Sequence, residues 1–546
     1  MFKCKQLLRR ICVVSYVFLL CGGLVNASNL VSKTNTLIGT QGNGWASGYL
    51  YPGATYPFGM VQFTPTYFTK QLGFVINQLS GAGCDHMGNF PTLPIAGALR
   101  VSPDSILNMQ TPVGKEIGTA GYYAATVDHS IRAELTVTER TGMARYTFSS
   151  KEKQGTVIIG GGVAATSIQV AAIKITGPHS CEGYAEGGAF CGIPTPYKVY
   201  FVAEFDADAE SFGTWKEERL HANHTFAEGS HSGVYFTFPL KEGNQAVQYK
   251  IGVSYVSVEN ARENLRVENP AWDFSAVRQA TQDKWNEYLG KIEVEGDNED
   301  RQMQFYTHLY RSLIHPNVCS DVNGEYMGAD SQVHKTARKF YTSFSNWDTY
   351  RTQTALIAML APEETSDIVM SHYLFAEQSG GGFPRWVLAN IETGVMQGDP
   401  TPILVANAYA FGARTYDPRT LLRTMRYGAE VPGANSQGVL TRPGLEQYLE
   451  KGYYDASILL EYTSSDFAIG RFALQACNDE PVCNWYTQRA MNWKNLFNKE
   501  TGWLQSRNED GSWKRYDADW RESTYKNYFW MVPYDLQGLI DSIGGK

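Results

Sequence analysis

Three segments of the chain combine carboxylates and arginines with tryptophans, and none of them keeps a regular period. They read SFSNWDTYRTQ (343–353), GGGFPRWVLANIETGVMQGDP (380–400) and WRESTYKNYFWMVPYD (520–535). Such sets suit glycoside cleavage, in which one carboxyl group protonates the leaving oxygen and a second group activates water or attacks the sugar. A tryptophan beside the acid stacks on the sugar and excludes water, which favours the protonated acid. The candidate functional residues are Trp347, Asp348, Arg351, Arg385, Trp386, Glu392, Asp399, Glu522 and Trp530.

Several of these residues also have a structural interpretation. Asp348 could cap the helix predicted after it, with Arg351 one turn on as its ion-pair partner. Asp399 could cap the helix that follows Pro400, and Glu522 could be a surface carboxylate. One by one these residues are weak indicators, but together they favour a sugar-cleaving site.

Other chemistries find little support in the sequence. HExxH and CxxC spacings, which would indicate zinc, do not occur, and neither does GxSxG or a phosphate-binding loop. His86 and His372 are expected to be core or loop histidines rather than catalytic bases. The formal net charge of −8 argues against binding to nucleic acid or to an anionic membrane surface.

The first 27 residues predict a signal peptide. Four basic residues precede the apolar run ICVVSYVFLL, and small residues end at Ala27. The run is shorter than the 20 or so residues that a membrane span needs. A lipid anchor at Cys21 is a minor alternative, because Leu20 is large for the usual lipidation signal. We therefore expect export to the periplasm or the extracellular space, with no membrane span.

Export permits disulfide bonds among the six later cysteines. Cys181–Cys191 and Cys477–Cys483 are close enough in sequence to pair. Cys84 and Cys319 could form a third pair or remain free buried thiols.

The elements that position these residues fall into two halves. Residues 28–258 alternate apolar and polar side chains in short runs such as YYAATVDHSIRAELTVTERTGMARYTF (122–148), separated by turn residues. This pattern predicts an N-terminal β-sandwich domain. Residues 259–297 predict a helical linker, and residues 298–546 show apolar residues at three- and four-residue spacings, which predict helices. Strands followed by helices favour two packed domains, β and then α.

The ordered motifs resemble those of glycoside hydrolase family 92. The similar stretches are NTLIGTQGNG, YPGATYPFGMVQFTP, GFVINQLSGAGC, SNWDTYRTQTAL, GGGFPRWVLANIETGVMQGDP and YFWMVPYDLQGLIDSIGG. The resemblance implies a β-sandwich packed on an (α/α)6 barrel, with the loop of residues 51–65 at the domain interface. It also implies a Ca2+-dependent, exo-acting α-mannosidase that inverts the anomeric centre of a mannose-containing glycan.

The resemblance also implies roles for particular residues. Glu522 matches the general acid, although Ser523, Thr524 and Lys526 depart from the motif around it. Asp348 matches the aspartate that binds sugar hydroxyls. The other expected substrate-binding residues are Trp347, Arg351, Arg385, Trp386 and Asp399.

Family members continue well beyond the position of Lys546. Because about eight helical segments are recognisable here, fewer than the twelve of an (α/α)6 barrel, we expect the helical domain to be incomplete. The expected missing part would carry the general base and most Ca2+ ligands, and a second chain could supply it. The alternative is a catalytically inactive remnant or a glycan-binding protein.

Overall fold

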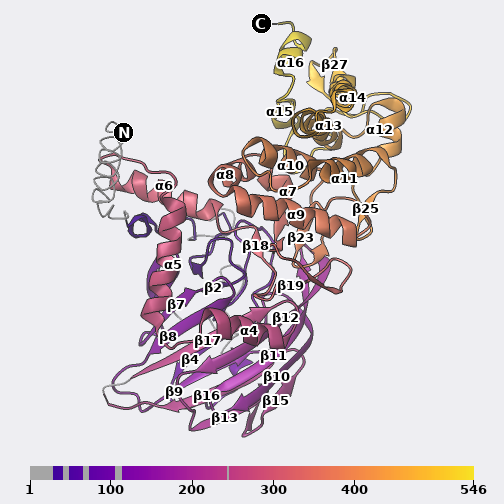
Figure 1. Ribbon diagram of the computed structural model, residues 1–546. Coiled ribbons are helices and arrows are strands. Elements are labelled where there is room, and N and C mark those ends of the chain that lie inside the picture. Colours follow the sequence, from indigo (N-terminus) through magenta and orange to yellow (C-terminus); the bar gives the residue numbers. More distant parts are fainter. Residues whose placement is uncertain (1–28, 41–47, 66–72, 105–112, 243–244, 546) are drawn as a thin grey trace, which may run out of the picture.

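The computed structural model describes residues 29–40, 48–65, 73–104, 113–242 and 245–545. A sheet-rich half is followed by a helical half that lies against one end of the sheets (Figure 1). The predicted order of β domain and then α domain is confirmed. The predicted signal peptide, residues 1–27, lies outside the described residues.

Two antiparallel sheets form the sandwich. The eight-stranded sheet has the order β1 (Ala54–Thr55), β2 (Gln62–Pro65), β3 (Phe74–Val75), β4 (Thr92–Ala96), β9 (Gln154–Gly160), β16 (Ser232–Pro239), β13 (Ser211–Lys216), β14 (Arg219–Ala222). The nine-stranded sheet has the order β15 (Phe226–Glu228), β10 (Ile168–Gly177), β11 (Ser180–Phe190), β12 (Ile193–Phe205), β17 (Ala246–Ser254), β8 (Thr141–Thr147), β7 (Ile131–Val137), β6 (Tyr122–Val127), β5 (Val113–Thr119).

The sheets form because alternate residues of their strands are apolar. In β7, Ile131, Ala133 and Leu135 are buried, while Arg132 and Glu134 between them are partly exposed. The buried faces of both sheets join in one core, where each large apolar side chain contributes about 1.5–3 kcal/mol relative to its exposed state.

Three helices connect the sandwich to the helical half, namely α4 (Val258–Glu268), α5 (Phe274–Leu289) and α6 (Glu299–Ser312). Each begins at a side chain that accepts a hydrogen bond from the backbone N–H three residues on, at Ser257, Asp273 and Asn298. Such a cap is worth about 1 kcal/mol. Helix α4 packs on β12 and β17, and α5 packs on β7 and β8, so both cover the nine-stranded sheet.

Short strands and helices make up the second half. The strands are β18 (Asn317–Val318), β19 (Glu325–Met327), β20 (Val333–Lys335), β21 (Tyr341–Thr342), β22 (Phe344–Ser345), β23 (Trp386–Leu388), β24 (Ile391–Glu392), β25 (Asn435–Ser436), β26 (Val439–Leu440), β27 (Phe497–Asn498) and β28 (Trp503–Leu504). The helices are α7 (Asn346–Thr349), α8 (Gln353–Leu360), α9 (Pro362–Gln378), α10 (Thr401–Ala410), α11 (Pro418–Glu430), α12 (Leu445–Lys451), α13 (Ala456–Cys477), α14 (Glu480–Ala490), α15 (Tyr525–Tyr528) and α16 (Leu536–Ser542), with the 3-10 helix η2 (Met491–Leu496). A second 3-10 helix, η1 (Leu30–Lys33), precedes the sandwich and packs on α5 and α6.

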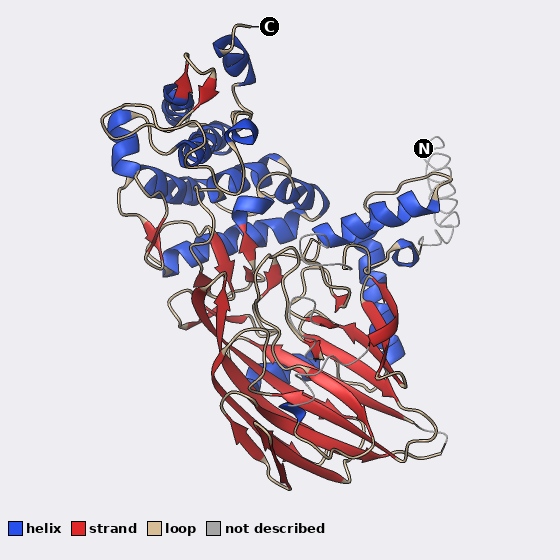
Figure 2. Cartoon of the chain, turned by 180° about the vertical axis from the view of Figure 1, so that it is seen from behind, coloured by secondary structure: helices blue, strands red, loops and turns tan. Residues whose placement is uncertain are grey.

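The longer helices pack in two rows. Helix α10 lies between α8 and α13 in one row, while α9, α11 and α14 pack against them from the other side (Figures 1 and 2). Helix α13 is buried over most of its length, including the ionisable side chains Glu461 and Asp466. Two rows of alternating helices are the unit of an (α/α)6 barrel, and the closed barrel stays a prediction.

The loop of residues 51–59 packs the sandwich against the linker helices. The carbonyl oxygen of Tyr51 accepts a hydrogen bond from Arg311 Nη1 (2.7 Å), and that of Thr55 accepts one from Trp285 Nε1 (2.7 Å). Side chains of α5 and α6 thereby satisfy two backbone carbonyls of this loop, while β1 within it pairs with β2.

The cysteine pairing predicted from sequence proximity is wrong. The disulfide joins Cys84 to Cys191, and Cys181 is a free buried thiol. Strand β11 runs between Cys181 and Cys191, and at about 3.3 Å per residue it holds their Cα atoms roughly 30 Å apart. Cys319 is also free and buried, as are Cys477 and Cys483, which were the second predicted pair.

No helix among the described residues is both long and apolar enough to cross a membrane.

Candidate active site

An open pocket of about 370 Å³ lies where the turn after α7 meets the segment around α15. Its volume falls within the roughly 300–1,000 Å³ typical of small-molecule sites. The lining residues are Trp347, Arg351, Arg521, Glu522, Ser523, Asn527, Tyr528, Trp530 and Met531. Trp347 and Arg351 from one of the singled-out segments and Glu522 from another therefore share one pocket.

One wall of the pocket is built by a break between two helices. Helix α7 ends at Thr349, and α8 begins at Gln353 after Thr352, which has φ −151° and makes no side-chain cap. The break leaves Arg351 with a side chain 39% exposed. Its guanidinium carbon lies 4.6 Å from the ring centroid of Trp347, a cation–π contact. The guanidinium of Arg351 therefore faces the pocket, and the indole of Trp347 lies against it.

A buried glutamate that sequence reasoning missed lies behind this wall. Glu461, in the middle of α13, accepts hydrogen bonds from Trp347 Nε1 (3.0 Å) and from the Tyr350 hydroxyl (3.0 Å). Arg351 Nη2 lies 3.5 Å from Glu461 Oε1. Burial raises the pKa of Glu461 to about 7, although Arg351 and the two hydrogen bonds pull it down. The available signal was a glutamate directly after the apolar residues Leu459 and Leu460 of a predicted helix.

Glu522 faces the pocket from a strained stretch of backbone. It is exposed and has φ +50°, a left-handed conformation unusual for a residue other than glycine. Such strain costs about 1–3 kcal/mol and concentrates at functional sites. Asn527 Nδ2 donates to Ser523 Oγ at 2.9 Å and ties this segment to α15. The Nζ of Lys526 lies 5.8 Å from the ring centroid of Tyr525.

Asp348 and Trp386 lie beside the same turn. Surrounding protein removes enough water to raise the pKa of Asp348, while hydrogen bonds from Ser345 and Trp386 and the charge of Arg351 lower it in part. Asp348 lies within α7 and accepts from Ser345, so it does not cap α8. Trp386 is buried and packs on Phe190 of β11 with ring centroids 4.3 Å apart. It therefore joins the wall of the site to the sandwich.

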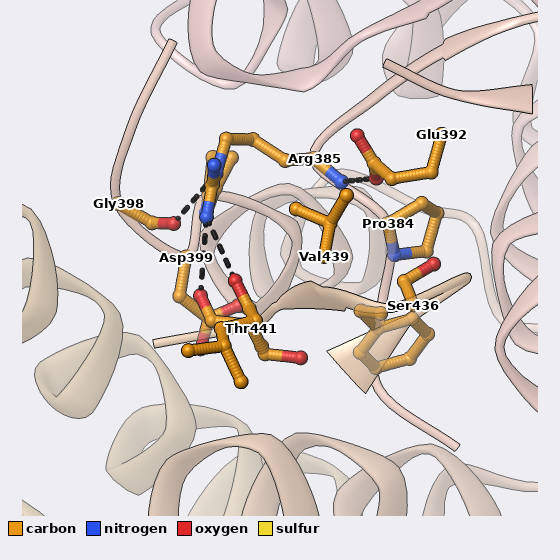
Figure 3. A pocket seen from close by; sticks show the side chains of 11 residues that line it. Pro384, Arg385, Glu392, Gly398, Asp399, Ser436, Val439 and Thr441 are labelled. Carbon is orange, nitrogen blue, oxygen red and sulfur yellow. Dashed lines mark hydrogen bonds between the residues drawn. The ribbon is translucent and has the colours of Figure 1, made fainter. Parts of the chain in front are cut away.

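Arg385 lies elsewhere, around a small enclosed cavity (Figure 3). The cavity is about 10 Å³, room for one water molecule at most. Arg385 Nε donates to the carbonyl of Gly398 (3.0 Å) and Nη2 donates to that of Leu440 (3.1 Å). Glu392 accepts the backbone N–H groups of Arg385 (2.6 Å) and Trp386 (3.2 Å). These side chains hold loops together.

Asp399 belongs to a buried ionic network rather than to a helix cap. Arg442 bridges Asp399 Oδ2 (2.8 Å) and Asp466 Oδ1 (2.7 Å), and Arg489 Nε donates to Asp466 Oδ2 (2.7 Å). Burial opposes ionisation of Asp466, but Arg489 and Arg442 outweigh it and lower its pKa. Burial raises the pKa of Asp399 in spite of Arg442. The network fixes the loop between β26 and α12, the segment before α10, and α14 against α13.

No cluster of acidic, histidine or cysteine side chains marks a metal site in the part of the chain that the structure describes. Over those residues, no group of three or more histidine, cysteine, aspartate or glutamate side chains is arranged to hold a metal ion. His86 and His372 are buried, as predicted, and burial lowers the pKa of each to about 4. Both imidazoles are therefore neutral at neutral pH.

The comparisons with known proteins identify the family. The model of the glycosyl hydrolase family 92 N-terminal domain matches residues 34–254, and that of the family 92 catalytic domain matches residues 260–546. The chain belongs to glycosyl hydrolase family 92. It is therefore a glycoside hydrolase, and the pocket with Glu522 lies within the part matched by the family 92 catalytic domain.

Solved family 92 structures have the same fold. An α-mannosidase from Bacteroides thetaiotaomicron is 24% identical with a TM-score of 0.86, over 95% of this chain and 73% of that one, and it has also been solved with mannoimidazole. An inverting mannosidase from Bacteroides thetaiotaomicron VPI-5482 is 26% identical with a TM-score of 0.85, over 94% and 72%. An uncharacterized secreted glycosidase from Arthroderma benhamiae is 24% identical, over 95% and 72%.

Proposed function

We propose that this family 92 glycoside hydrolase is an exo-acting α-mannosidase that removes terminal mannose from glycans with inversion. The observation that carries the proposal is the position of Glu522, in one pocket with Trp347 and Arg351. The 26%-identical relative, an inverting mannosidase, supports the substrate and the stereochemistry, and mannoimidazole bound to another relative supports recognition of a mannose-like ring.

In this proposal Glu522 protonates the glycosidic oxygen as the bond breaks. Its place at the pocket surface leaves it open to the substrate, and a bound sugar would displace the water around it. Trp530, with 63% of its surface exposed, offers a ring face for stacking on the sugar. Arg351 and Asp348 supply a donor and an acceptor for sugar hydroxyls.

Inversion also needs a base that activates water across the sugar ring, about 6.5–9.5 Å from the acid. We assign this role to none of the described residues. Dependence on Ca2+ is part of the proposal through the family resemblance, and the described side chains provide no three-ligand group for the ion.

Export of the protein is also part of the proposal. The Arthroderma benhamiae relative is described as secreted. The disulfide between Cys84 and Cys191 agrees with folding in an oxidising compartment.

The test is mannose release from α-1,2-, α-1,3-, α-1,4- and α-1,6-mannobiose, with Ca2+ and with EDTA. The proposal expects release from at least one disaccharide, loss of release in EDTA and the β-anomer as first product. Binding of mannose without release would favour a glycan-binding protein. If the protein neither binds mannose nor releases it from any of the disaccharides, the proposal is overturned.

A further inference from the structure

Glu461 is a buried carboxylate with an unusual set of partners. Its residue exposure is 0%, so it has no access to water. The donors that reach it, Trp347, Tyr350 and Arg351, all come from the one short stretch that forms the pocket wall. A carboxylate buried without partners would be strongly destabilising, so these donors are what make its position tolerable.

The partners reach from the core to the pocket. The indole of Trp347 and the phenol of Tyr350 are buried, whereas the Arg351 side chain is 39% exposed and lines the pocket. The guanidinium carbon lies 4.6 Å and 4.9 Å from the ring centroids of Trp347 and Tyr350. The two rings and the carboxylate therefore restrict the guanidinium from three directions.

The backbone opposite Glu461 is shaped to admit it. Gly398 has φ +77°, and a Cβ atom there would lie 2.7 Å from the Cβ of Glu461. The loop before α10 thus passes directly over the glutamate stem. The carboxylate is held from the Gly398 side and from the α7–α8 turn at once.

We propose that Glu461 is a positioning residue: from beneath the pocket, its carboxylate orients Arg351, with Trp347 and Tyr350, toward a sugar bound beside Glu522. This inference rests on the proposed function, because it takes the sugar to bind in that pocket. Glu461 touches no substrate and acts through Arg351.

The reason for a carboxylate at this place is geometric. One oxygen accepts from Trp347 and faces Arg351, while the other accepts from Tyr350. A glutamine could accept the indole N–H but would carry no charge to attract the guanidinium. An arginine without such a partner would lose conformational entropy when it binds the sugar, which weakens binding. Because Glu461 restricts Arg351 before the sugar binds, this entropic cost is reduced.

The experiment is a double-mutant cycle on ligand binding at pH 8, above the pKa of about 7 at which Glu461 ionises, with mannoimidazole as the probe and isothermal titration as the readout. Glu461→Gln is expected to weaken binding about tenfold, the scale of one charge-assisted contact. In an Arg351→Ala background, the same Glu461→Gln change is expected to have no further effect. Tyr350→Phe, which removes one hydroxyl donor and keeps the ring, is expected to weaken binding by a smaller factor.

Glu430→Gln is the matched control. Glu430 accepts from the Tyr486 hydroxyl (2.9 Å) and pairs with Arg426 (2.7 Å), so its partners are of the same kinds, but none of them lines the pocket. Its probe affinity should equal that of the wild type.

The outcomes separate the two claims. If the wild type binds no probe with or without Ca2+, the proposed function fails. If the wild type binds but Glu461→Gln and Tyr350→Phe bind equally well, or if the Glu461 effect persists undiminished without Arg351, the positioning role is overturned. Should Glu461→Gln fail to fold, unchanged affinity in Tyr350→Phe and Arg351→Ala overturns it.

Discussion

Glu461 carries an ionisable group where water cannot reach it, and its protonation is therefore linked to folding. Burial raises its pKa from the ordinary 4.5 to about 7. The groups that face it are Arg351, Tyr350 and Trp347 from the α7–α8 turn, and Tyr528 from α15. Between these two pKa values, the folded protein holds a proton that the unfolded chain has released.

This linkage predicts a pH-dependent stability difference. The contribution of Glu461 stabilises the fold below pH 4.5 and is lost as the pH rises through 7. Between pH 5 and pH 8, the wild type should lose about 2–3 kcal/mol of unfolding free energy relative to Glu461→Gln, which has nothing to titrate. Denaturant titrations of both proteins at the two pH values measure the difference. A difference independent of pH would contradict the raised pKa.

At the scale of the element, α13 is the helix on which the site is built. Glu461 on it holds the pocket wall, and Asp466 on it holds Arg442 and Arg489. Helix α13 is therefore expected to be sensitive to substitution at two places. One is the close approach of the Gly398 backbone to Glu461, and the other is the pairing of Asp466 with Arg442 and Arg489.

Gly398→Ala tests the close approach. The substitution is expected to destabilise the protein by about 2–4 kcal/mol, since a positive φ and a clash with Glu461 add together. Gly438→Ala is the control, because Gly438 has φ +81° and nothing within 4 Å of the added Cβ. Its cost should be about 1 kcal/mol. Equal shifts in thermal midpoint would show that contact with Glu461 is unimportant.

Asp466→Asn tests the charge pairing. The change leaves Arg442 and Arg489 without their shared buried counter-ion, so a loss of about 3–5 kcal/mol is expected. Glu430→Gln is the control, because the ion pair of Glu430 with Arg426 is partly exposed. This substitution should lower the unfolding free energy by about 1 kcal/mol or less. Similar unfolding free energies for the two variants would argue against a central role for the network.

The elements could be predicted from the sequence more fully than the site. Strands β6 to β8 and helices such as α9, α11 and α13 follow from apolar periods of two and three to four residues. Short elements such as α12 and α15 have too few residues to show a period. The role of Glu461 could not be predicted, because its partners lie in a turn more than a hundred positions away in the sequence. A local sequence pattern carries no information on such a contact. Arg385 was expected at the substrate, but the structure shows its donors occupied by loop carbonyls.

At the scale of the molecule, the sandwich supports the helical half through contacts that link the two. Cys84 and Cys191, 107 positions apart, fix the tip of the β11–β12 hairpin. Next to that tip, Phe190 packs on Trp386, which in turn borders the site at Asp348. The disulfide thus stabilises the surface on which the site rests.

Removal of this disulfide is expected to cost about 2–5 kcal/mol, the range for a long loop. Double replacement of Cys84 and Cys191 by alanine should lower the thermal midpoint, and dithiothreitol should lower that of the wild type but not that of the variant. Replacement of the free thiols Cys477 and Cys483 should leave the response to dithiothreitol intact. A wild type indifferent to dithiothreitol, with the bond shown to be reduced, would contradict this expectation.

The proposed reaction depends on Glu522 as the proton donor in the pocket, and one comparison of two substrates tests this role most directly. Wild type and Glu522→Gln should be assayed on a mannobiose and on a dinitrophenyl α-mannoside, whose leaving group needs no proton. We expect a loss of at least about 100-fold on the disaccharide and little loss on the activated mannoside. An equal loss on both substrates, or none on either, would contradict the account.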